Sequence, residues 1–232
     1  MRSPEPVALV TGANRGTGQA IIHQLRDRGY RTYELNRTFD GNRPGVVQCD
    51  VSRPEQVRLA VERITAETGR IDVCVANAVD RVLKNISDLR QEEWDHLVST
   101  NLSSVFALVK ETLPWLRESR GLMVVMGSNS ADNFFEGGVA YSSTKAGLRA
   151  IVENLLVEER KNGVRACLVT PGAISNLDGD ESPQKISVDS VARCIVSIAH
   201  EWPHDLVVSN IEIRPSSVPP FPIQGIDRLL YL

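Results

Sequence analysis

A glycine-rich turn directly after the first apolar segment constrains the fold of this chain most strongly. Residues 7–10 are apolar, residues 11–18 read TGANRGTG, and an amphipathic stretch follows to residue 28. Gly12, Gly16 and Gly18 let the backbone turn sharply, and the helix that follows presents unpaired N–H groups and a positive dipole to a phosphate. The pattern therefore predicts a strand–turn–helix unit that binds a nucleotide, although any tight turn between a strand and a helix can also use glycine.

Short apolar runs alternate with longer amphipathic stretches along the rest of the chain. We expect strands at residues 7–10, 32–35, 46–49, 71–76, 122–126, 164–169 and 207–213. We expect helices at 18–28, 54–68, 92 to about 117 in one or two pieces, 145–161 and 188–200. Strands that are apolar throughout and separated by helices are typical of a parallel sheet covered on both faces. With right-handed crossovers this gives an α/β fold, a Rossmann-type doubly wound sheet of about seven strands.

We expect one domain over residues 1–232, because no linker, repeat or low-complexity segment interrupts the pattern. The exception is a Pro-rich tail from about residue 215, which ends in an apolar cluster at residues 229–232.

Composition excludes several classes of partner. The net charge of −3 gives no reason to expect nucleic acid or an anionic membrane surface. The four cysteines have no CxxC pair and no metal-ligand spacing, so we expect buried free thiols and no metal site; they are Cys49, Cys74, Cys167 and Cys194. No apolar run is long enough to span a bilayer and no signal sequence precedes residue 7, so we expect a cytoplasmic protein.

A tyrosine and a lysine four residues apart form the second chemical signal, in Tyr141-Ser142-Ser143-Thr144-Lys145. At the start of a helix this spacing places both side chains on one face. A free tyrosine, with a pKa of about 10, is a poor base at neutral pH, and a nearby ammonium lowers that pKa. Taken alone, the pair fits an acid/base site and an interfacial tyrosine beside a solvated lysine equally well.

Two further polar residues favour the acid/base interpretation. Ser128 follows the expected strand at 122–126, where parallel sheets bind ligands, and its hydroxyl can donate to a substrate carbonyl. Ser130 is an alternative for this role, and a serine at a strand end also serves turns. Asn101 lies inside an expected helix, where an isolated asparagine normally weakens or bends the helix.

Together, the TGxxxGxG turn and the Tyr-x-x-x-Lys pair resemble the short-chain dehydrogenase/reductase family over roughly residues 7 to 214. The spacing of Ser128 from Tyr141 matches the family better than that of Ser130. The resemblance implies a catalytic tetrad of Asn101, Ser128, Tyr141 and Lys145. In it Tyr141 is the acid/base, Ser128 orients the substrate oxygen, Lys145 tunes Tyr141 and binds ribose, and Asn101 holds a water that relays protons.

The resemblance also implies a nicotinamide dinucleotide cofactor. The positions that match the family's binding residues are Gly12, Asn14, Arg15, Gly16, Thr17, Gly18, Asn36, Arg37, Asp50, Val51, Asn77, Ala78, Pro171, Gly172 and Ile174. Family spacing places the acidic residue of NAD enzymes at Asn36, which has no charge, and Arg37 and Arg15 lie where a 2′-phosphate would bind. We therefore expect NADP(H). Ala76, Val79 and Asn176 depart from the family pattern.

The expected function is interconversion of a carbonyl and an alcohol on a small organic substrate by hydride transfer. The alternatives are a dehydratase or epimerase on the same fold and a non-catalytic NADP(H)-binding protein. A short acidic segment, residues 174–187, is expected to cover the cleft. We also expect a homodimer or homotetramer, because the helices around 101–117 and 145–161 carry more apolar residues than one sheet face needs, among them Phe106, Leu113, Trp115, Leu155 and Leu156.

Overall fold

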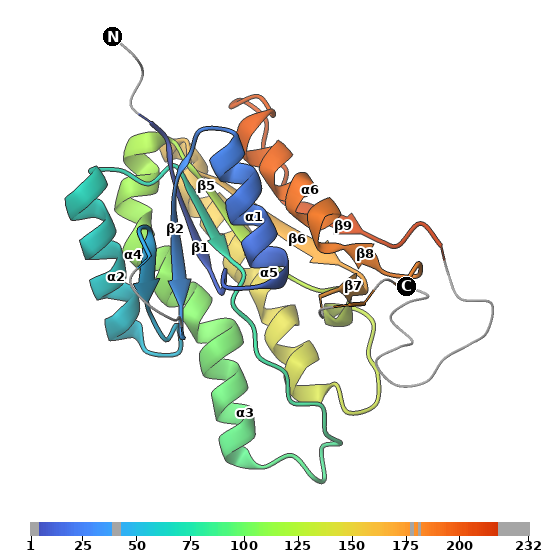
Figure 1. The fold of residues 1–232 in the computed structure, drawn as a ribbon. Helices are drawn as coiled ribbons and strands as arrows, with labels where there is room; N and C mark the ends of the chain where they lie inside the picture. The colour runs from blue at the N-terminus through green and yellow to red at the C-terminus, as the bar shows by residue number, and fades with distance from the viewer. Residues whose placement is uncertain (1–4, 39–42, 177–178, 181, 218–232) are drawn as a thin grey trace.

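The centre of the protein is a parallel β-sheet (Figure 1). The computed structural model describes residues 5–38, 43–176, 179–180 and 182–217, and in this part of the chain the main sheet has seven strands in the order β3-β2-β1-β4-β5-β6-β9. Their bounds are β1 Val7–Thr11, β2 Arg31–Asn36, β3 Val46–Gln48, β4 Val73–Ala76, β5 Leu122–Met126, β6 Arg165–Pro171 and β9 Asn210–Ile213. The strand order reverses between β1 and β4, which confirms the predicted doubly wound sheet.

Helices cover both faces of the sheet, as Figure 1 shows. The helices are α1 Gly16–Asp27, α2 Pro54–Thr68, α3 Gln91–Val98, α4 Ser104–Ser119, α5 Val139–Glu159 and α6 Val188–His200. Apolar side chains of α1 and α6 belong to one core cluster, and those of α2, α4 and α5 belong to the other. The fold therefore has three layers, with a separate hydrophobic core on each side of the sheet.

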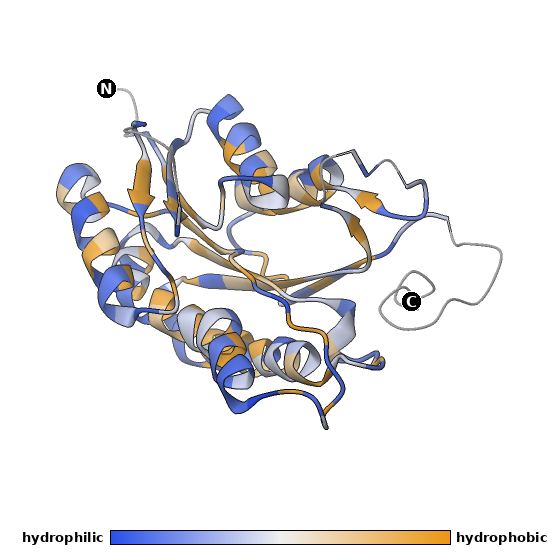
Figure 2. Ribbon diagram, turned by 60° about the horizontal axis from the view of Figure 1, so that its bottom comes forward, coloured by the Kyte–Doolittle hydropathy of each residue, from blue (hydrophilic) through white to orange (hydrophobic). Residues whose placement is uncertain are grey.

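Alternation along each strand supplies both cores at once. In β1, Ala8 and Val10 pack toward α1 and α6, while Leu9 packs toward α2, α4 and α5. All three are fully buried. Figure 2 shows the apolar strands between helices whose polar faces point outward. This two-sided burial explains why the strands are apolar throughout in the sequence.

Two segments differ from the sequence-based prediction, and a third settles whether one stretch is a single helix or two pieces. Helix α5 begins at Val139, not at residue 145, so that Tyr141 lies in its first turn. The run Ser142-Ser143-Thr144 has low helix propensity, which concealed this turn in the sequence. The expected helix from 92 to about 117 is divided by the π-helical turn Ser99–Ser103. A small parallel pair, β7 Ile174–Ser175 and β8 Ile186–Ser187, was not predicted because each strand is only two residues long.

The apolar residues expected at an oligomer interface do not all reach the surface. Leu155 and Leu156 are buried in the core, so their inclusion in the expected interface is wrong. Phe106 on α4 is 61% exposed, and Val157 on α5 is 75% exposed. The homo-oligomer itself stays a prediction. The Pro-rich tail is placed only to residue 217, and its remainder lies outside the described residues.

Cys49, Cys74 and Cys167 are buried free thiols, as predicted, and Cys194 is a partly buried one. Within the described ranges, no helix is both long enough and apolar enough to span a bilayer.

An ion pair between a half-exposed arginine and a buried glutamate holds the far end of α5, the helix that carries Tyr141. Arg117 on α4 donates from Nε and Nη2 to the two carboxylate oxygens of Glu159, at 2.7 and 2.5 Å. Asn162 donates to the same carboxylate at 2.7 Å. These hydrogen bonds, from Arg117 above all, lower the pKa of Glu159 to about 2.

We expect Glu159→Gln to lower the melting temperature at neutral pH by a few degrees. Because the pKa of Glu159 is lower in the folded protein, its contribution to stability is complete above the ordinary pKa of the carboxyl and is lost as the pH falls toward 2. The difference between variant and wild type should therefore shrink in acid. Thermal unfolding followed by circular dichroism at several pH values measures this. Glu158→Gln, at the exposed neighbouring position, is the control, and equal effects of the two changes would contradict the prediction.

Candidate active site

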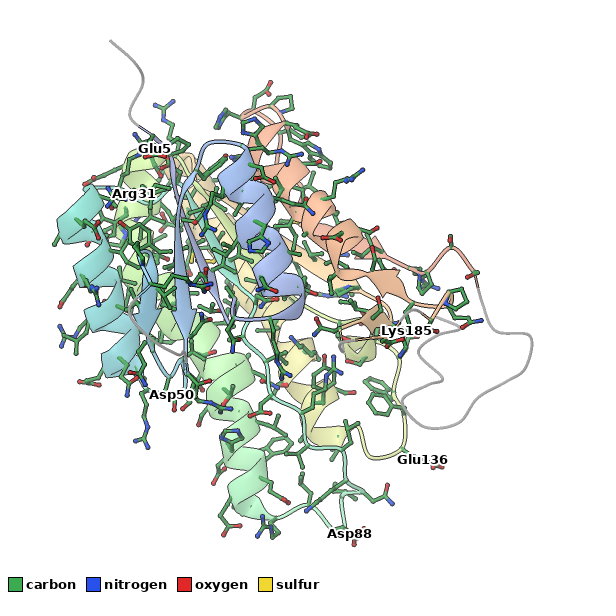
Figure 3. All side chains as sticks on the ribbon, in the orientation of Figure 1. Glu5, Arg31, Asp50, Asp88, Glu136 and Lys185 are labelled. Carbon is green, nitrogen blue, oxygen red and sulfur yellow. The ribbon has the colours of Figure 1, made fainter. Side chains whose placement is uncertain are left out.

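Two adjoining cavities lie at the carboxyl edge of the sheet, beside the reversal of strand order. The first, the catalytic cavity, has a volume of about 250 Å³ and contains Ser128, Tyr141 and Lys145. The second, the polar cavity, has a volume of about 440 Å³ and follows the glycine-rich turn toward Asp50. Figure 3 shows Asp50 and Lys185 at this edge and Glu5 and Arg31 at the opposite one. Thr17 and Asn77 line both cavities, so the two lie side by side.

The glycine-rich turn is hydrogen-bonded to the loop that follows β4. The Thr11 hydroxyl oxygen accepts from the backbone N–H groups of Asn77 and Ala78, at 2.9 and 3.0 Å. The Asn77 amide donates back to the carbonyl oxygens of Thr11 and Gly12, both at 3.0 Å. Gly12 has φ +62°, and a Cβ at Gly18 would lie 2.4 Å from the Gly12 oxygen. Larger residues at these positions would disturb the cradle.

Asn36 does not line the polar cavity, although the sequence placed it among the cofactor-binding positions. Its side chain is buried, and Oδ1 accepts from the backbone N–H of Ala13 at 2.7 Å. Its amide donates to Glu34 at 3.2 Å, which places the two side chains on the same face of β2. Asn36 therefore supports the glycine-rich turn from behind.

Asn176 lies at the start of helix α1 although it is far away in sequence. Its Oδ1 accepts from the Thr17 backbone N–H at 3.0 Å, and a Cβ at Gly16 would lie 2.1 Å from that oxygen. A carboxamide oxygen thus holds one of the N–H groups that a helix start presents to phosphate. Asn176 lines both cavities, a position that the sequence showed only as a departure from the family pattern.

Tyr141 and Lys145 are brought together inside the catalytic cavity. Both side chains are buried, and Lys145 Nζ lies 5.8 Å from the centre of the Tyr141 ring and donates to the Met126 carbonyl oxygen at 2.6 Å. Burial lowers the pKa of Lys145 and raises that of Tyr141. For Tyr141 the charges of Lys145 and Arg81 and the interaction with Ser128 outweigh burial, so that the pKa of this phenol lies below its usual value.

Of the two candidate serines, only Ser128 lines the catalytic cavity. Ser130 is fully buried, and its hydroxyl donates to the Ser128 oxygen at 2.9 Å. The Ser130 backbone N–H donates to the same oxygen at 3.2 Å. With these two donors fixing its oxygen, Ser128 keeps its own hydroxyl proton for another acceptor.

Asn101 lies in the π-helical turn between α3 and α4, where an asparagine was expected to disturb the helix. Its side chain is buried and does not line the catalytic cavity. Oδ1 accepts from the Asp80 backbone N–H at 2.9 Å, and the amide donates to the Asp80 carbonyl oxygen at 3.0 Å and to the Thr144 hydroxyl at 3.3 Å. Asn101 therefore links the loop after β4 to helix α5; a water-binding role stays a prediction.

Arg81 belongs to the catalytic cavity and was missed in the sequence. Its Cζ lies 5.5 Å from the centre of the Tyr141 ring. No motif marks this position, and only the path of the loop after β4 brings the side chain to the tyrosine. The cavity thus has Arg81 and Lys145 beside one phenol.

Apart from Gly16, the remaining predicted cofactor positions line the two cavities. Residues of the glycine-rich turn line the polar cavity together with Arg37, Asp50, Val51 and Ala78. Arg37 Nη1 lies 3.6 Å from a carboxylate oxygen of Asp80, which lines the same cavity. Pro171, Gly172 and Ile174, at the end of β6 and in β7, line the catalytic cavity. Gly16 contacts Asn176 and does not line the polar cavity.

Comparison with known proteins points to one family. The family model of the short chain dehydrogenases matches residues 6–185. The chain is 33% identical over 182 residues to a 3-oxoacyl-[acyl-carrier-protein] reductase of Escherichia coli, covering 72% of this chain and 73% of that protein. It is 27% identical over 239 residues to an uncharacterised oxidoreductase of Staphylococcus saprophyticus, covering 92% of this chain and 97% of the relative.

Solved structures give the same result. An alcohol dehydrogenase of Thermococcus sibiricus, complexed with 5-hydroxy-NADP, superposes with a TM-score of 0.82 at 26% identity and covers 93% of this chain and 99% of that one. A metagenomic short-chain oxidoreductase in complex with NADP also gives 0.82 at 26% identity, with coverages of 92% and 99%. The chain therefore belongs to the short-chain dehydrogenase/reductase family of oxidoreductases.

Proposed function

We propose that this protein interconverts a carbonyl and an alcohol on a small organic substrate, with NADP(H) as its cofactor and Tyr141 as its acid/base. The observation that carries the proposal is that Ser128, Tyr141 and Lys145 line one cavity, which adjoins the polar cavity along the glycine-rich turn. Family membership supports oxidoreductase chemistry, and the geometry supports the individual roles.

The residues along the two cavities fit a nicotinamide dinucleotide. The start of α1 lines the polar cavity through Thr17 and Gly18, where helix N–H groups suit a phosphate. A Cβ at Gly12 or Gly18 would lie within 3 Å of backbone atoms of the turn and of the loop after β4, so this close packing requires glycine. The neighbouring Pro171–Ile174 segment suits the nicotinamide end, because it lines the catalytic cavity beside Lys145. Bound there, the cofactor supplies or accepts the hydride. Since Asn176 Oδ1 occupies the Thr17 N–H, a phosphate at this point takes the place of that oxygen.

The protein's own groups then handle the substrate oxygen and its proton. Ser128 donates a hydrogen bond to the carbonyl oxygen, since its hydroxyl proton is not needed by Ser130. Tyr141 gives its phenolic proton to that oxygen during reduction and takes it back during oxidation. Lys145, held by the Met126 carbonyl, lies beside the phenol, and its ammonium charge lowers the pKa of Tyr141 and so makes the phenolate easier to form.

Tyr141→Phe should abolish turnover while leaving cofactor affinity nearly unchanged. The substitution removes only the oxygen that carries the proton, and acid/base catalysis is typically worth about 10²–10⁴-fold. Steady-state kinetics and a cofactor binding titration measure the two effects. Tyr30→Phe is the matched control, because it removes a hydroxyl that bonds to the Ala199 carbonyl outside both cavities. Retention of more than about a tenth of wild-type kcat would refute the role of Tyr141.

The pH dependence should report the lowered pKa of Tyr141. In alcohol oxidation the phenolate is the base, so kcat/KM should rise with pH to a plateau, with a midpoint below the usual tyrosine value of about 10. Carbonyl reduction should fall over the same interval. Ser128→Ala removes an interaction that lowers this pKa, so the midpoint should move upward. A wild-type midpoint at or above the usual value would contradict the prediction.

The preference for NADP(H) is supported by charges at the end of β2. Arg15 and Arg37 both line the polar cavity and are exposed there. Glu34, the nearby acidic residue of β2, is buried and accepts from Arg43 at 2.7 Å, so its charge has a partner outside the cavity. Arg37 now pairs with the half-exposed Asp80, which a 2′-phosphate would replace as its partner.

We expect NADPH to be favoured over NADH by roughly a hundredfold in kcat/KM, the effect of a few kcal/mol. Steady-state kinetics with both cofactors and one substrate provide the test, and equal or better activity with NADH would refute the assignment. Arg37→Asp should narrow or reverse the preference, because its carboxylate repels a 2′-phosphate. Arg63→Asp, at an exposed position on α2 outside both cavities, is the charge-matched control.

A further inference from the structure

We propose that Arg81 recognises a carboxylate on the substrate, one or two carbon atoms from the carbonyl that is reduced. The substrate class would then be small 2-oxo or 3-oxo acids and the matching hydroxy acids. This inference rests on the proposed function, because it assumes that the reacting carbonyl lies at Tyr141.

The guanidinium group of Arg81 lies in the catalytic cavity, beside the Tyr141 ring. Arg81 lines the catalytic cavity, and its Cζ is 5.5 Å from the centre of the Tyr141 ring. It enters from the loop after β4, whereas Lys145 enters from α5 and lies 5.8 Å from the same centre. The phenol thus has two cations near it, and only Lys145 is engaged by the backbone, through the Met126 carbonyl.

The charges that line the catalytic cavity also favour an anionic substrate. The described residues that line the catalytic cavity include Arg81, Lys145 and Lys185 and no aspartate or glutamate. Lys185 already pairs with Asp180 at 2.6 Å. The adjacent carboxylate, Asp80, is directed to His96 at 2.9 Å and Arg37 at 3.6 Å. Among the described side chains, no carboxylate oxygen lies within 4.0 Å of the Arg81 guanidinium, so a substrate anion can take that place.

Geometry and size narrow the class of anion. A guanidinium binds a carboxylate through two parallel hydrogen bonds, which suits a planar acid group better than a neutral ester. Because Arg81 lies so close to Tyr141, a carboxylate bound there must be near the carbonyl that Tyr141 protonates. The catalytic cavity, about 250 Å³, must also hold the nicotinamide end of the cofactor, which leaves room for a small molecule only.

A purely electrostatic role for Arg81 is the competing explanation, because its charge also lowers the pKa of Tyr141. The two explanations differ in one measurable quantity. An effect on Tyr141 changes the reduction of every substrate alike, whereas carboxylate binding changes the reduction of acids alone. The ratio of kcat/KM for an acid to that for its methyl ester therefore isolates the recognition of the carboxylate.

The experiment measures this ratio for 3-oxobutanoate and methyl 3-oxobutanoate with NADPH in wild type, Arg81→Met and Arg81→Lys. We expect wild type to favour the acid, and Arg81→Met to lower the ratio by about 10–100-fold, the effect of losing charge-assisted hydrogen bonds at a solvent-exposed site. Arg81→Lys should keep part of the preference for the acid that Arg81→Met loses, because it retains a positive charge. Arg63→Met, on the exposed face of α2, should leave the ratio unchanged. A ratio that is the same in wild type and Arg81→Met would overturn the proposal.

A binding measurement separates this proposal from the proposed function. Calorimetric titration of 3-hydroxybutanoate and its methyl ester into wild type and Arg81→Met, each saturated with NADPH, needs no turnover. Tighter binding of the acid in wild type, lost in Arg81→Met, supports carboxylate recognition even where no carbonyl compound is reduced. If the ester is reduced and the acid is preferred neither in binding nor in turnover, carboxylate recognition by Arg81 is refuted. The proposed oxidoreductase function is then still supported. Thermal unfolding of each variant confirms that it is folded.

Discussion

The hydrogen bonds between the glycine-rich turn and the loop after β4 form the junction on which the rest of the site depends. The hydroxyl oxygen of Thr11, at the end of β1, accepts hydrogen bonds from two backbone N–H groups of that loop. The side-chain amide of Asn77 donates to two carbonyl oxygens of the turn. The junction spans the reversal of strand order, where the adjacent strand ends leave an open crevice. The same loop then supplies Asp80 to Asn101 and Arg81 to Tyr141. One set of backbone contacts thus positions groups in both cavities.

The pKa values of Tyr141 and Lys145 depend on two features of the catalytic cavity: both side chains are buried, and no described aspartate or glutamate lines it. Burial alone would make the Tyr141 phenol harder to ionise, and the positive charges of Lys145 and Arg81 reverse that effect. Burial lowers the pKa of Lys145, and the interaction with Tyr141 opposes part of this effect. Ser130 contributes indirectly, since it fixes the Ser128 oxygen from beneath the cavity. The site therefore works as a set of coupled charges and donors, and removing one member changes the pKa of another.

Much of the fold was predictable from local patterns, and so were three candidate residues that share one cavity, Ser128, Tyr141 and Lys145. The glycine-rich turn, the apolar strands and the Tyr-x-x-x-Lys spacing are short-range features, and each leads to one structural solution. The prediction was less accurate where long-range contacts decide. Leu155 and Leu156 were assigned to an interface, but the sheet buries them. Asn36 was placed in the cofactor site, but the Ala13 backbone holds its side chain beneath the turn.

The sequence by itself determined the doubly wound α/β class and the position of the glycine-rich turn, because strand alternation and glycine conformation are local properties of the chain. It also singled out Ser128, Tyr141 and Lys145 as candidates, through helical spacing and the family resemblance. Only the tertiary structure decided which side chains share a cavity. It brought Asn176 to the start of α1 and Arg81 to the phenol of Tyr141. It also placed Ser130 behind Ser128, where Ser130 donates to the Ser128 oxygen and does not line the catalytic cavity. These outcomes depend on the paths of loops between distant elements, and no periodicity or propensity encodes such paths.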